Sequence, residues 1–171
     1  GSNVKRVTDR PGYDGGAFFS HDGSKLVLRS AFPKDAKMAA EDFGGKVLGK
    51  SIEIVSADHQ NKADIASNTA RKWFDEEKVD VVADLVSSST AGAVMPVAAE
   101  KKRITLLSGP ATTAFTGEKC TAYNVHYTYN NWMLANGTGR EVVRQGGDSW
   151  YFVTADYVFG KSLEEDTSNV V

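Results

Sequence analysis

Small hydroxyl-bearing side chains gather in two short segments of the sequence, Ser87-Ser-Ser-Thr90 and Ser108-Gly-Pro-Ala-Thr-Thr113. Hydroxyl groups, together with the free backbone amides at the start of a helix, bind carboxylates and other small anions. Each segment follows an apolar run typical of a β-strand, and Tyr127-Thr-Tyr129 ends a third. Because open α/β sheets bind ligands beyond the carboxyl ends of their strands, these segments predict a pocket for a small carboxylate. Ser and Thr are equally common as helix caps and turn formers, so a purely structural role stays open.

A glycine-rich segment, Gly44–Ser51, matches the phosphate-loop pattern GxxxxGK[ST]. A phosphate loop follows a strand and opens a helix, so that helix amides converge on the phosphate. Here the order is reversed, because a helix is predicted to end at Phe43 and a strand to begin at Ser51. We therefore interpret the glycines as a helix stop and a turn.

The remaining reactive side chains form no arrangement that supports catalysis or metal binding. The single cysteine, Cys120, permits neither a disulfide within the chain nor a thiolate zinc site. No serine lies in a GxSxG elbow, and no histidine pair has metal-ligand spacing. The residues considered are His21, His59, His126, Asp58, Asp84 and Asp156. The sequence thus predicts no enzyme activity, no cofactor and no metal site.

The elements that would position the hydroxyl-rich segments alternate along the chain. Strands are predicted at Ser51–Ala57, Val79–Leu85, Arg103–Leu107, Tyr123–Tyr129 and Trp150–Val153. Helices are predicted from a cap at Asp64 to Phe74, after Ser87–Thr90, from Asn130 or Asn131 to Val143, and near Lys161–Val170. Such alternation is typical of an α/β fold, here a three-layer, doubly wound, mostly parallel sheet.

The first 35 residues follow a different pattern. Ala17-Phe-Phe19 and Lys25–Arg29 flank a turn at Asp22-Gly23, which predicts a β-hairpin. A helix from Asp35 to Phe43, with Ala36, Ala39, Ala40 and Phe43 inward, would connect it to the sheet. We therefore divide the chain into residues 1–34 and 35–171, folded as one unit. We expect Leu26-Val-Leu28 to supply a strand that the sheet otherwise lacks.

The charge composition argues against nucleic acid and membranes as partners. The 171 residues carry a formal net charge of −2, which lacks the basic footprint that nucleic acid or an anionic membrane surface attracts. No apolar run is long enough to span a bilayer, and the first residues, Gly1 to Arg6, lack the apolar region that is typical of a signal peptide. Gly1-Ser2 looks like the remnant of a cleaved tag, so we expect cytoplasmic recombinant expression.

Four segments resemble the type I periplasmic solute-binding proteins of branched-chain amino acid ABC transporters. They are Lys37–Gly45, Ile54–Lys62, Leu134–Gly139 and Thr154–Gly160. The resemblance covers about residues 36–171 and implies a periplasmic origin. It also implies that Ser87, Ser88 and Ser89, with Ala111 and Thr112, bind the carboxylate and amino group of a ligand, and that Tyr157 approaches from a second lobe. The chain departs from the family because it lacks the first strand and most of the second lobe, so an open, half-enclosed site is expected.

Residues 4–33 resemble a blade of Tol-type β-propellers, which carry a similar Phe-Ser-x-Asp-Gly core. Two families meeting near residue 34 suggest an engineered chimera. We therefore expect a folded α/β domain with no complete binding site and no physiological function; the alternative is weak binding of an amino acid or similar small carboxylate. Apolar residues around Trp150–Phe152 and Val170-Val171 would be left exposed, which predicts a homodimer.

Overall fold

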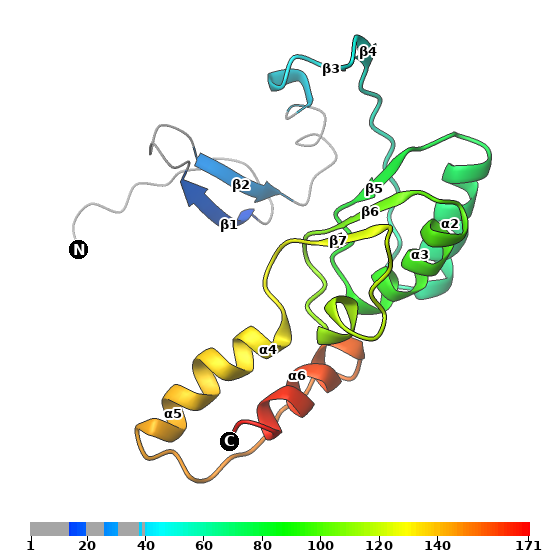
Figure 1. Cartoon of the computed structure of the whole chain (residues 1–171). Coiled ribbons are helices and arrows are strands. Elements are labelled where there is room, and N and C mark those ends of the chain that lie inside the picture. Colours follow the sequence, from blue (N-terminus) through cyan, green and yellow to red (C-terminus); the bar gives the residue numbers. More distant parts are fainter. Residues whose placement is uncertain (1–13, 20–25, 31–37, 39) are drawn as a thin grey trace. The chain divides into compact units, whose positions relative to one another are not determined.

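The computed structural model describes residues 14–19, 26–30, 38 and 40–171 (Figure 1). The chain divides into two compact units, Gly1–Ala57 and Asp58–Val171. Each unit is presented by itself below.

The first unit contains two antiparallel hairpins. Strand β1 (Asp14–Phe19) pairs with β2 (Leu26–Ser30), which confirms the hairpin predicted from the sequence. Strand β3 (Lys46–Val47) pairs with β4 (Lys50–Ser51) across a turn in which Leu48 and Gly49 have φ of 50° and 79°. Two successive positive φ angles are the geometry of a tight hairpin turn, which favours glycine.

Two expectations for this unit are wrong. Leu26–Leu28 belongs to a two-stranded sheet with β1 and is not a strand of the parallel sheet. Phe43 was expected to point inward, but its side chain is 72% exposed. Residues 38 and 40–42 are helical, while 35–37 and 39 of the predicted helix lie outside the described residues. The helix stop is confirmed, because Gly44 has a φ of 100°.

The second unit is built on a parallel sheet, which confirms the α/β fold class. Its strands are β5 (Val81–Ala83), β6 (Ile104–Leu107) and β7 (Asn124–His126), in that spatial order. Helix α2 (Ala63–Asp75) precedes β5, and α3 (Ser88–Glu100) connects β5 to β6. A 3-10 turn, η1 (Thr113–Thr116), lies between β6 and β7.

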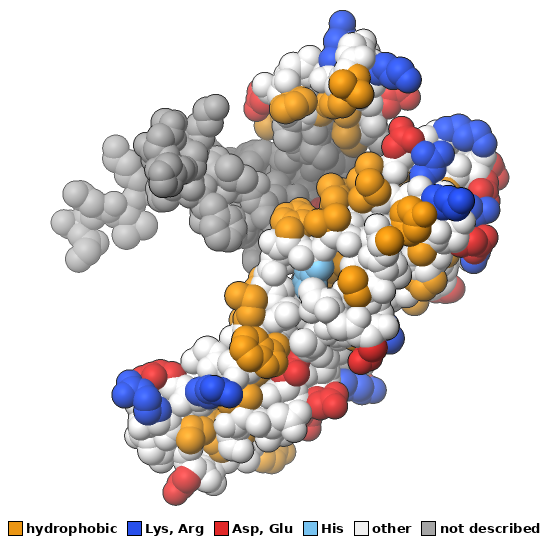
Figure 2. All heavy atoms as spheres, in the orientation of Figure 1, with side chains coloured by type: hydrophobic (Ala, Val, Ile, Leu, Met, Phe, Trp, Pro, Cys, Tyr) orange, Lys and Arg blue, Asp and Glu red, His pale blue; other side chains and the backbone are white. Residues whose placement is uncertain are grey.

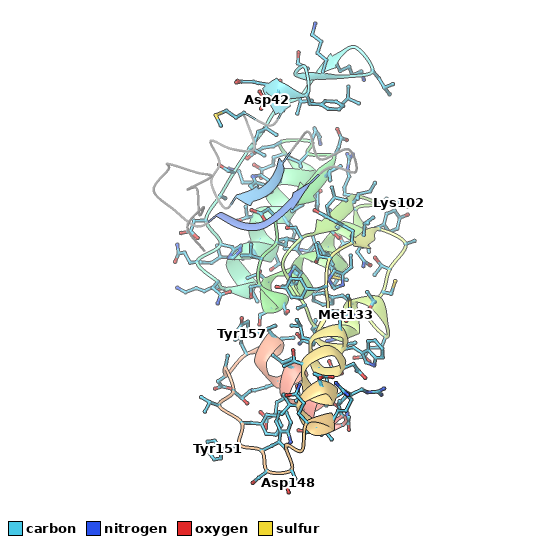
Figure 3. All side chains as sticks on the ribbon, turned by 90° about the vertical axis from the view of Figure 1, so that its left-hand side faces the viewer. Asp42, Lys102, Met133, Asp148, Tyr151 and Tyr157 are labelled. Atoms are coloured by element: carbon cyan, nitrogen blue, oxygen red, sulfur yellow. The ribbon has the colours of Figure 1, made fainter. Side chains whose placement is uncertain are left out.

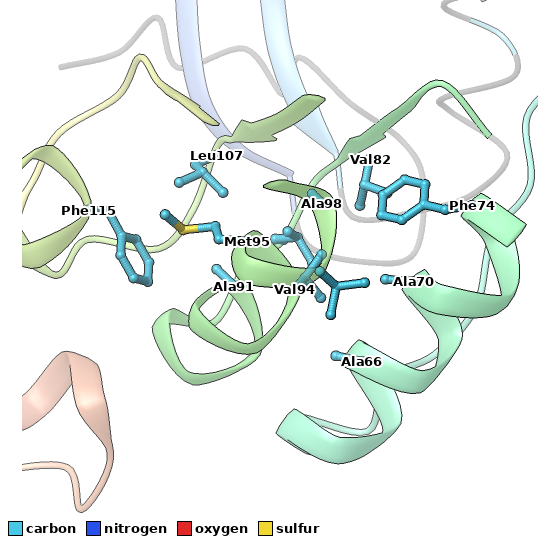
Figure 4. Close-up of a cluster of buried hydrophobic side chains, with 12 residues drawn as sticks. Ala66, Ala70, Phe74, Val82, Ala91, Val94, Met95, Ala98, Leu107 and Phe115 are labelled. Atoms are coloured by element: carbon cyan, nitrogen blue, oxygen red, sulfur yellow. The ribbon is translucent and has the colours of Figure 1, made fainter. Parts of the chain in front are cut away.

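The core lies between one face of this sheet and the helices α2 and α3 (Figure 4). Helix α2 contributes Ala66, Ala70 and Phe74, which are four residues apart and therefore share one helix face. From the sheet, Val82 and Leu107 are buried against the helices. Helix α3 has apolar residues around most of its circumference, and its buried members are Ala91, Val94, Met95, Val97 and Ala98. Burial of this helix between α2 and the sheet explains its composition.

Apolar side chains on the other face of the sheet are not covered by any helix of the second unit. Val81, Ile104 and Val125 are each between 42% and 47% exposed, and the first two alternate with buried neighbours along their strands. Hydrophobic side chains gather over the strands and over α4 (Figure 2). Parallel sheets are usually covered on both faces, so this surface is unusual for a parallel sheet.

A helical arm follows the sheet. It runs through α4 (Asn131–Leu134), the π-helical turn η2 (Ala135–Gly139) and α5 (Arg140–Arg144), and α6 (Val158–Ser168) returns alongside (Figure 1). The side chain of Asn130 caps α4 by accepting from the amide of Met133 at 3.0 Å. A Cβ atom at Gly139 would lie 3.2 Å from Val171, so a glycine allows the returning chain to approach closely.

Four predicted element boundaries need correction. Residues 52–57 and Trp150–Val153 are not in strands, because no strand among the described residues pairs with them. Helix α2 is capped by Lys62, and Asp64 lies in its first turn instead. Helix α6 begins at Val158, a few residues before the predicted start.

Candidate functional site

The carboxyl ends of the three parallel strands lie at one edge of the sheet, and each leads into a loop that carries polar residues. The loop after β5 leads to Ser87 and Ser88, the loop after β6 to Ala111 and Thr112, and the loop after β7 to Asn131. All five residues are at most 6% exposed. The strand-end rule of open α/β sheets places a ligand at this edge.

The hydroxyl of Ser88 joins the first two loops. Its Oγ accepts hydrogen bonds from the backbone amides of Ala111 at 3.2 Å and Thr112 at 3.4 Å. Both amides are buried and would otherwise lose their contact with water without compensation. Ser88 therefore fixes the position of the Ala111–Thr112 loop relative to the start of α3.

The start of α3 has the properties of an anion site. Ser87 is its N-cap residue, but the side chain of Ser87 makes no capping bond, and its buried Oγ has no partner among the described residues. The first turn contains no acidic side chain. The partial positive charge of the helix N-terminus and its unpaired amides are therefore not neutralised by the protein.

Asn131 closes the other side of the same loop. Its backbone amide donates to the carbonyl of Ala111 at 2.7 Å, and its side-chain Nδ2 donates to the carbonyl of Phe159, at the start of α6, at 3.0 Å. The Oδ1 of the same side chain is buried and has no partner in the described part of the chain. One fully buried residue thus links the β6 loop to α6.

Helix α6 lies over the strand-end loops and contacts α3, α4 and η2. The hydroxyl of Thr113 bonds to the carboxylate of Asp166 and lies 3.4 Å from the hydroxyl of Ser162. Gly160 is buried, and a Cβ there would lie 2.0 Å from the carbonyl oxygen of Ala155. A glycine therefore allows the connection before α6 to fold closely against the first turn of that helix.

Two further polar side chains near the sheet edge lack partners among residues 14–19, 26–30, 38 and 40–171. Both ring nitrogens of His126 on β7 are buried and unpaired, and so is the hydroxyl of Thr128 just beyond the strand. Unsatisfied buried polar atoms are rare in native proteins. Their concentration at the ends of β5 and β7 and at the start of α4 marks this edge as the candidate site.

The residues predicted from the sequence and the resemblance largely come together. Ser87, Ser88, Ala111 and Thr112 lie around one junction, and Ser89 follows on α3, where it is partly exposed. Tyr157 is the N-cap residue of α6, and its ring lies 5.8 Å from that of Phe159 (Figure 3). The first four of these residues are buried, and the chain spans 38% of the B. mallei protein described below, so the expectation of an open, half-enclosed site stays a prediction. Their role in ligand binding stays a prediction.

Asn131 and Asp166 were not predicted as members of the site, and Thr113 was predicted only as the end of the hydroxyl-rich segment Ser108–Thr113. Asn131 was identified only as the start of a helix. Thr113 and Asp166 are 53 positions apart in the sequence, and no local pattern connects them. For Asn131, the sequence contains one signal: a polar residue begins a helix shortly after the end of a predicted strand.

Two carboxylates lie at the strand-end loops: Asp84 accepts from the hydroxyl of Ser108 at 3.1 Å, and Asp166 accepts from the hydroxyl of Thr113. Lys161 on α6 forms an ion pair with Asp156 at 2.9 Å, and its hydrogen bond lowers the pKa of the Asp156 carboxyl. Asp156 is exposed and precedes Tyr157, so the pair lies at the rim of α6. Another close pair, Lys101 with Asp75 at 2.8 Å, joins the ends of α3 and α2 away from the strand-end loops.

The glycine-rich segment Gly44–Ser51 forms the β3–β4 hairpin and not a phosphate loop. In the residues that the structure describes, no three His, Cys, Asp or Glu side chains come close enough to hold a metal ion. No described helix combines the length and apolar character that crossing a membrane requires.

Residues 30–171 match the family model described as periplasmic binding protein. The chain belongs to the periplasmic binding protein family. The match covers both the sheet and the helical arm, and it leaves residues 1–29 outside. Comparison with curated proteins gives no significant match.

Solved structures of the family extend this result. A periplasmic binding protein from Burkholderia mallei is 50% identical, with a TM-score of 0.79, over 83% of this chain and 38% of its own. A branched chain amino acid ABC transporter periplasmic ligand-binding protein from Burkholderia xenovorans is 30% identical, with a TM-score of 0.66, over 78% of this chain and 36% of its own. An ABC transporter solute-binding protein from R. palustris, in complex with 4-hydroxybenzoate, shares the fold at 23% identity and a TM-score of 0.69, over 77% of this chain and 35% of its own. The chain thus spans less than two fifths of the length of these proteins.

The contacts of Ser88 generate a stability prediction. Ser88→Ala leaves the buried amides of Ala111 and Thr112 without their acceptor, so the free energy of unfolding should fall by about 1–3 kcal/mol. Ser89→Ala removes a hydroxyl at the next, partly exposed position and should change it by less than about 0.5 kcal/mol. Urea denaturation of both variants measures the difference. Equal stabilities would contradict the structural role assigned to Ser88.

Proposed function

We propose that the strand-end site binds the carboxylate of a small solute, at the start of α3, as part of a periplasmic solute-binding protein. The proposal rests on the N-terminus of α3, where the first turn supplies no negative charge and the N-cap side chain makes no capping bond. Its N-cap hydroxyl on Ser87 is buried and unpaired, and its first turn has no acidic residue. An anion placed there would bond to the free amides and gain from the helix dipole.

Family members support a small carboxylate as the solute class. The R. palustris relative is described in complex with 4-hydroxybenzoate, and the B. xenovorans relative is described as belonging to a branched chain amino acid transporter. Both kinds of solute carry one carboxylate on an apolar body. We therefore propose an amino acid or an aromatic acid, held by Ser87, Ser88 and Ser89 with Ala111 and Thr112, and approached by Tyr157.

The position of α6 adds a requirement. Because the site residues are buried beneath it, a solute enters only when α6 moves away from the loops. The bonds of α6 to Thr113 and Asn131 must then break and reform. This cost, and the small share of the relatives' length that the chain spans, predict weak binding, with a dissociation constant in the millimolar range.

The alternative is a folded chimera without physiological function. Residues 1–29 lie outside the family match, so the resemblance of residues 4–33 to a propeller blade stays a hypothesis. The solute-binding proposal and the chimeric alternative predict different results in a titration with small acids. A chimera without function binds none of the solutes, whereas the proposed site binds at least one.

Calorimetric titration with leucine, isoleucine, valine, phenylalanine and aromatic acids tests the proposal with two variants of one residue. Ser87→Asn and Ser87→Asp both place a good N-cap residue at the start of α3, and only the second adds a negative charge. Ser87→Asp should bind the carboxylate at least about tenfold more weakly than Ser87→Asn, because the two side chains have nearly the same shape and only the Asp repels a negative charge. Equal affinities of the two variants would contradict an anion site at this helix.

The parent chain provides the second criterion. Saturable binding of one of these acids in the millimolar range or tighter supports the proposal. If no acid binds at millimolar concentration, the solute-binding proposal fails and the chimeric alternative is favoured.

We also propose that the chain self-associates. Tyr151 and Val153 are 91% and 93% exposed, and Trp150 is partly exposed beside them, in the connection between α5 and α6 (Figure 3). Together with the sheet face that no helix of the second unit covers, these residues leave more apolar surface in water than is common for a monomer. Sedimentation at high micromolar concentration should show a homodimer, and a monomer at that concentration would contradict this proposal.

A further inference from the structure

One side chain at the candidate site offers a hydrogen-bond acceptor that nothing in the described chain uses. Asn131 is fully buried at the start of α4, and its backbone amide bonds to the carbonyl of Ala111. Ala111 is the residue whose own amide bonds to Ser88. The two hydrogen bonds of Ala111 thus connect Asn131 to Ser88, in the first turn of α3.

The orientation of this side chain is fixed by its partner. Nδ2 lies 3.0 Å from the carbonyl oxygen of Phe159. A carbonyl oxygen only accepts hydrogen bonds, so the reversed amide would place two acceptors against each other. The atom left over is therefore Oδ1, which is buried and unpaired.

Oδ1 accepts hydrogen bonds and donates none. A carboxylate is also acceptor-only when ionised, so the carboxylate of a solute leaves Oδ1 unpaired. A solute that carries an N–H or O–H donor in addition to its carboxylate satisfies both parts of the site. The helix amides then hold the carboxylate, and Asn131 receives the donor.

We propose that Asn131 is a specificity-determining residue, which selects carboxylates that also carry a hydrogen-bond donor, such as an ammonium or a hydroxyl group. The inference rests on the proposed function and adds a criterion for the solute. Sites built to pair a buried polar group discriminate strongly against analogues that lack the matching group, because the buried group is then left without a partner.

Two pairs of solutes test the criterion by calorimetry. Leucine and 4-methylpentanoate differ by the ammonium group, and 4-hydroxybenzoate and benzoate differ by the hydroxyl group. In at least one pair, the member with the donor should bind about tenfold tighter or more. The pair that shows the difference identifies whether the donor is an ammonium or a hydroxyl group.

Two variants test whether Asn131 causes the difference in affinity between the two solutes of a pair. Asn131→Leu removes the acceptor and should bring the affinity ratio of that pair close to one. It also removes the bond to Phe159, but loss of that bond weakens both members alike and leaves the ratio unchanged. Asn130→Ala, which removes the cap of α4 and a 3.5 Å bond to the hydroxyl of Thr116, is the matched control and should retain the ratio of the parent chain.

A second substitution covers the case in which Asn131→Leu does not fold. Asn131→Asp retains an acceptor at the same position and adds a negative charge. It should raise the leucine to 4-methylpentanoate ratio, because an ammonium group is a cation. If leucine and 4-methylpentanoate show the difference in the parent chain, an unchanged or lower ratio in this variant would contradict the role of Asn131. If 4-hydroxybenzoate and benzoate show it, Asn131→Asp still accepts from the hydroxyl group, and loss of that ratio would contradict the role of Asn131.

The outcomes separate this inference from the proposed function. If carboxylates bind but both ratios in the parent chain are close to one, the specificity role of Asn131 is wrong and the carboxylate site stands. A large ratio that persists in Asn131→Leu overturns the inference in the same way, since another group then receives the donor. If no carboxylate binds, the proposed function itself fails, and the inference fails with it.

Discussion

The hydrogen bonds from the amides of Ala111 and Thr112 to the hydroxyl of Ser88 hold the two strand-end loops together. Parallel pairing of β5, β6 and β7 brings those loops to one edge of the sheet, but pairing alone leaves their backbone groups free. Ser88 satisfies two of them from the first turn of a helix that is itself anchored in the core. The site therefore depends on how firmly α3 is packed between α2 and the sheet.

Several polar groups at this edge are buried without partners in the described part of the chain. Burying them lowers the stability of the fold, and this loss of stability needs an explanation. Each buried, unpaired group costs about 1–3 kcal/mol relative to a paired one. Ser87, Thr128 and Asn131 each contribute one such group, and α6 covers the loops while leaving these groups unsatisfied. The solute site that we propose would provide that explanation, because a polar solute would supply the missing bonds.

Helices were predicted from the sequence better than strands, for a physical reason. The pattern that predicts α2, with Ala66, Ala70 and Phe74 on one face, is satisfied within a single segment of chain. A strand needs hydrogen bonds from another strand, which its own sequence does not supply. Ser51–Ala57 and Trp150–Val153 have strand-like composition, yet no described strand pairs with residues 52–57 or 150–153, and they are not strands. The strand-end rule predicted the Ser87 and Ala111–Thr112 loops, but the bonds of Asn131 and Thr113 to α6 depend on tertiary packing that no local pattern reveals.

The central claim is that a small carboxylate binds at the start of α3, beneath α6, and amide chemical shifts test it most directly. Titration of the isotope-labelled chain with leucine and with 4-hydroxybenzoate, followed by two-dimensional NMR, reports on each backbone amide separately. The amides of Ser88, Ser89, Ala111 and Thr112 should shift in a saturable manner with at least one of the two solutes, together with those at the start of α6. Saturable shifts confined to other residues, or none at millimolar solute, would contradict the claim.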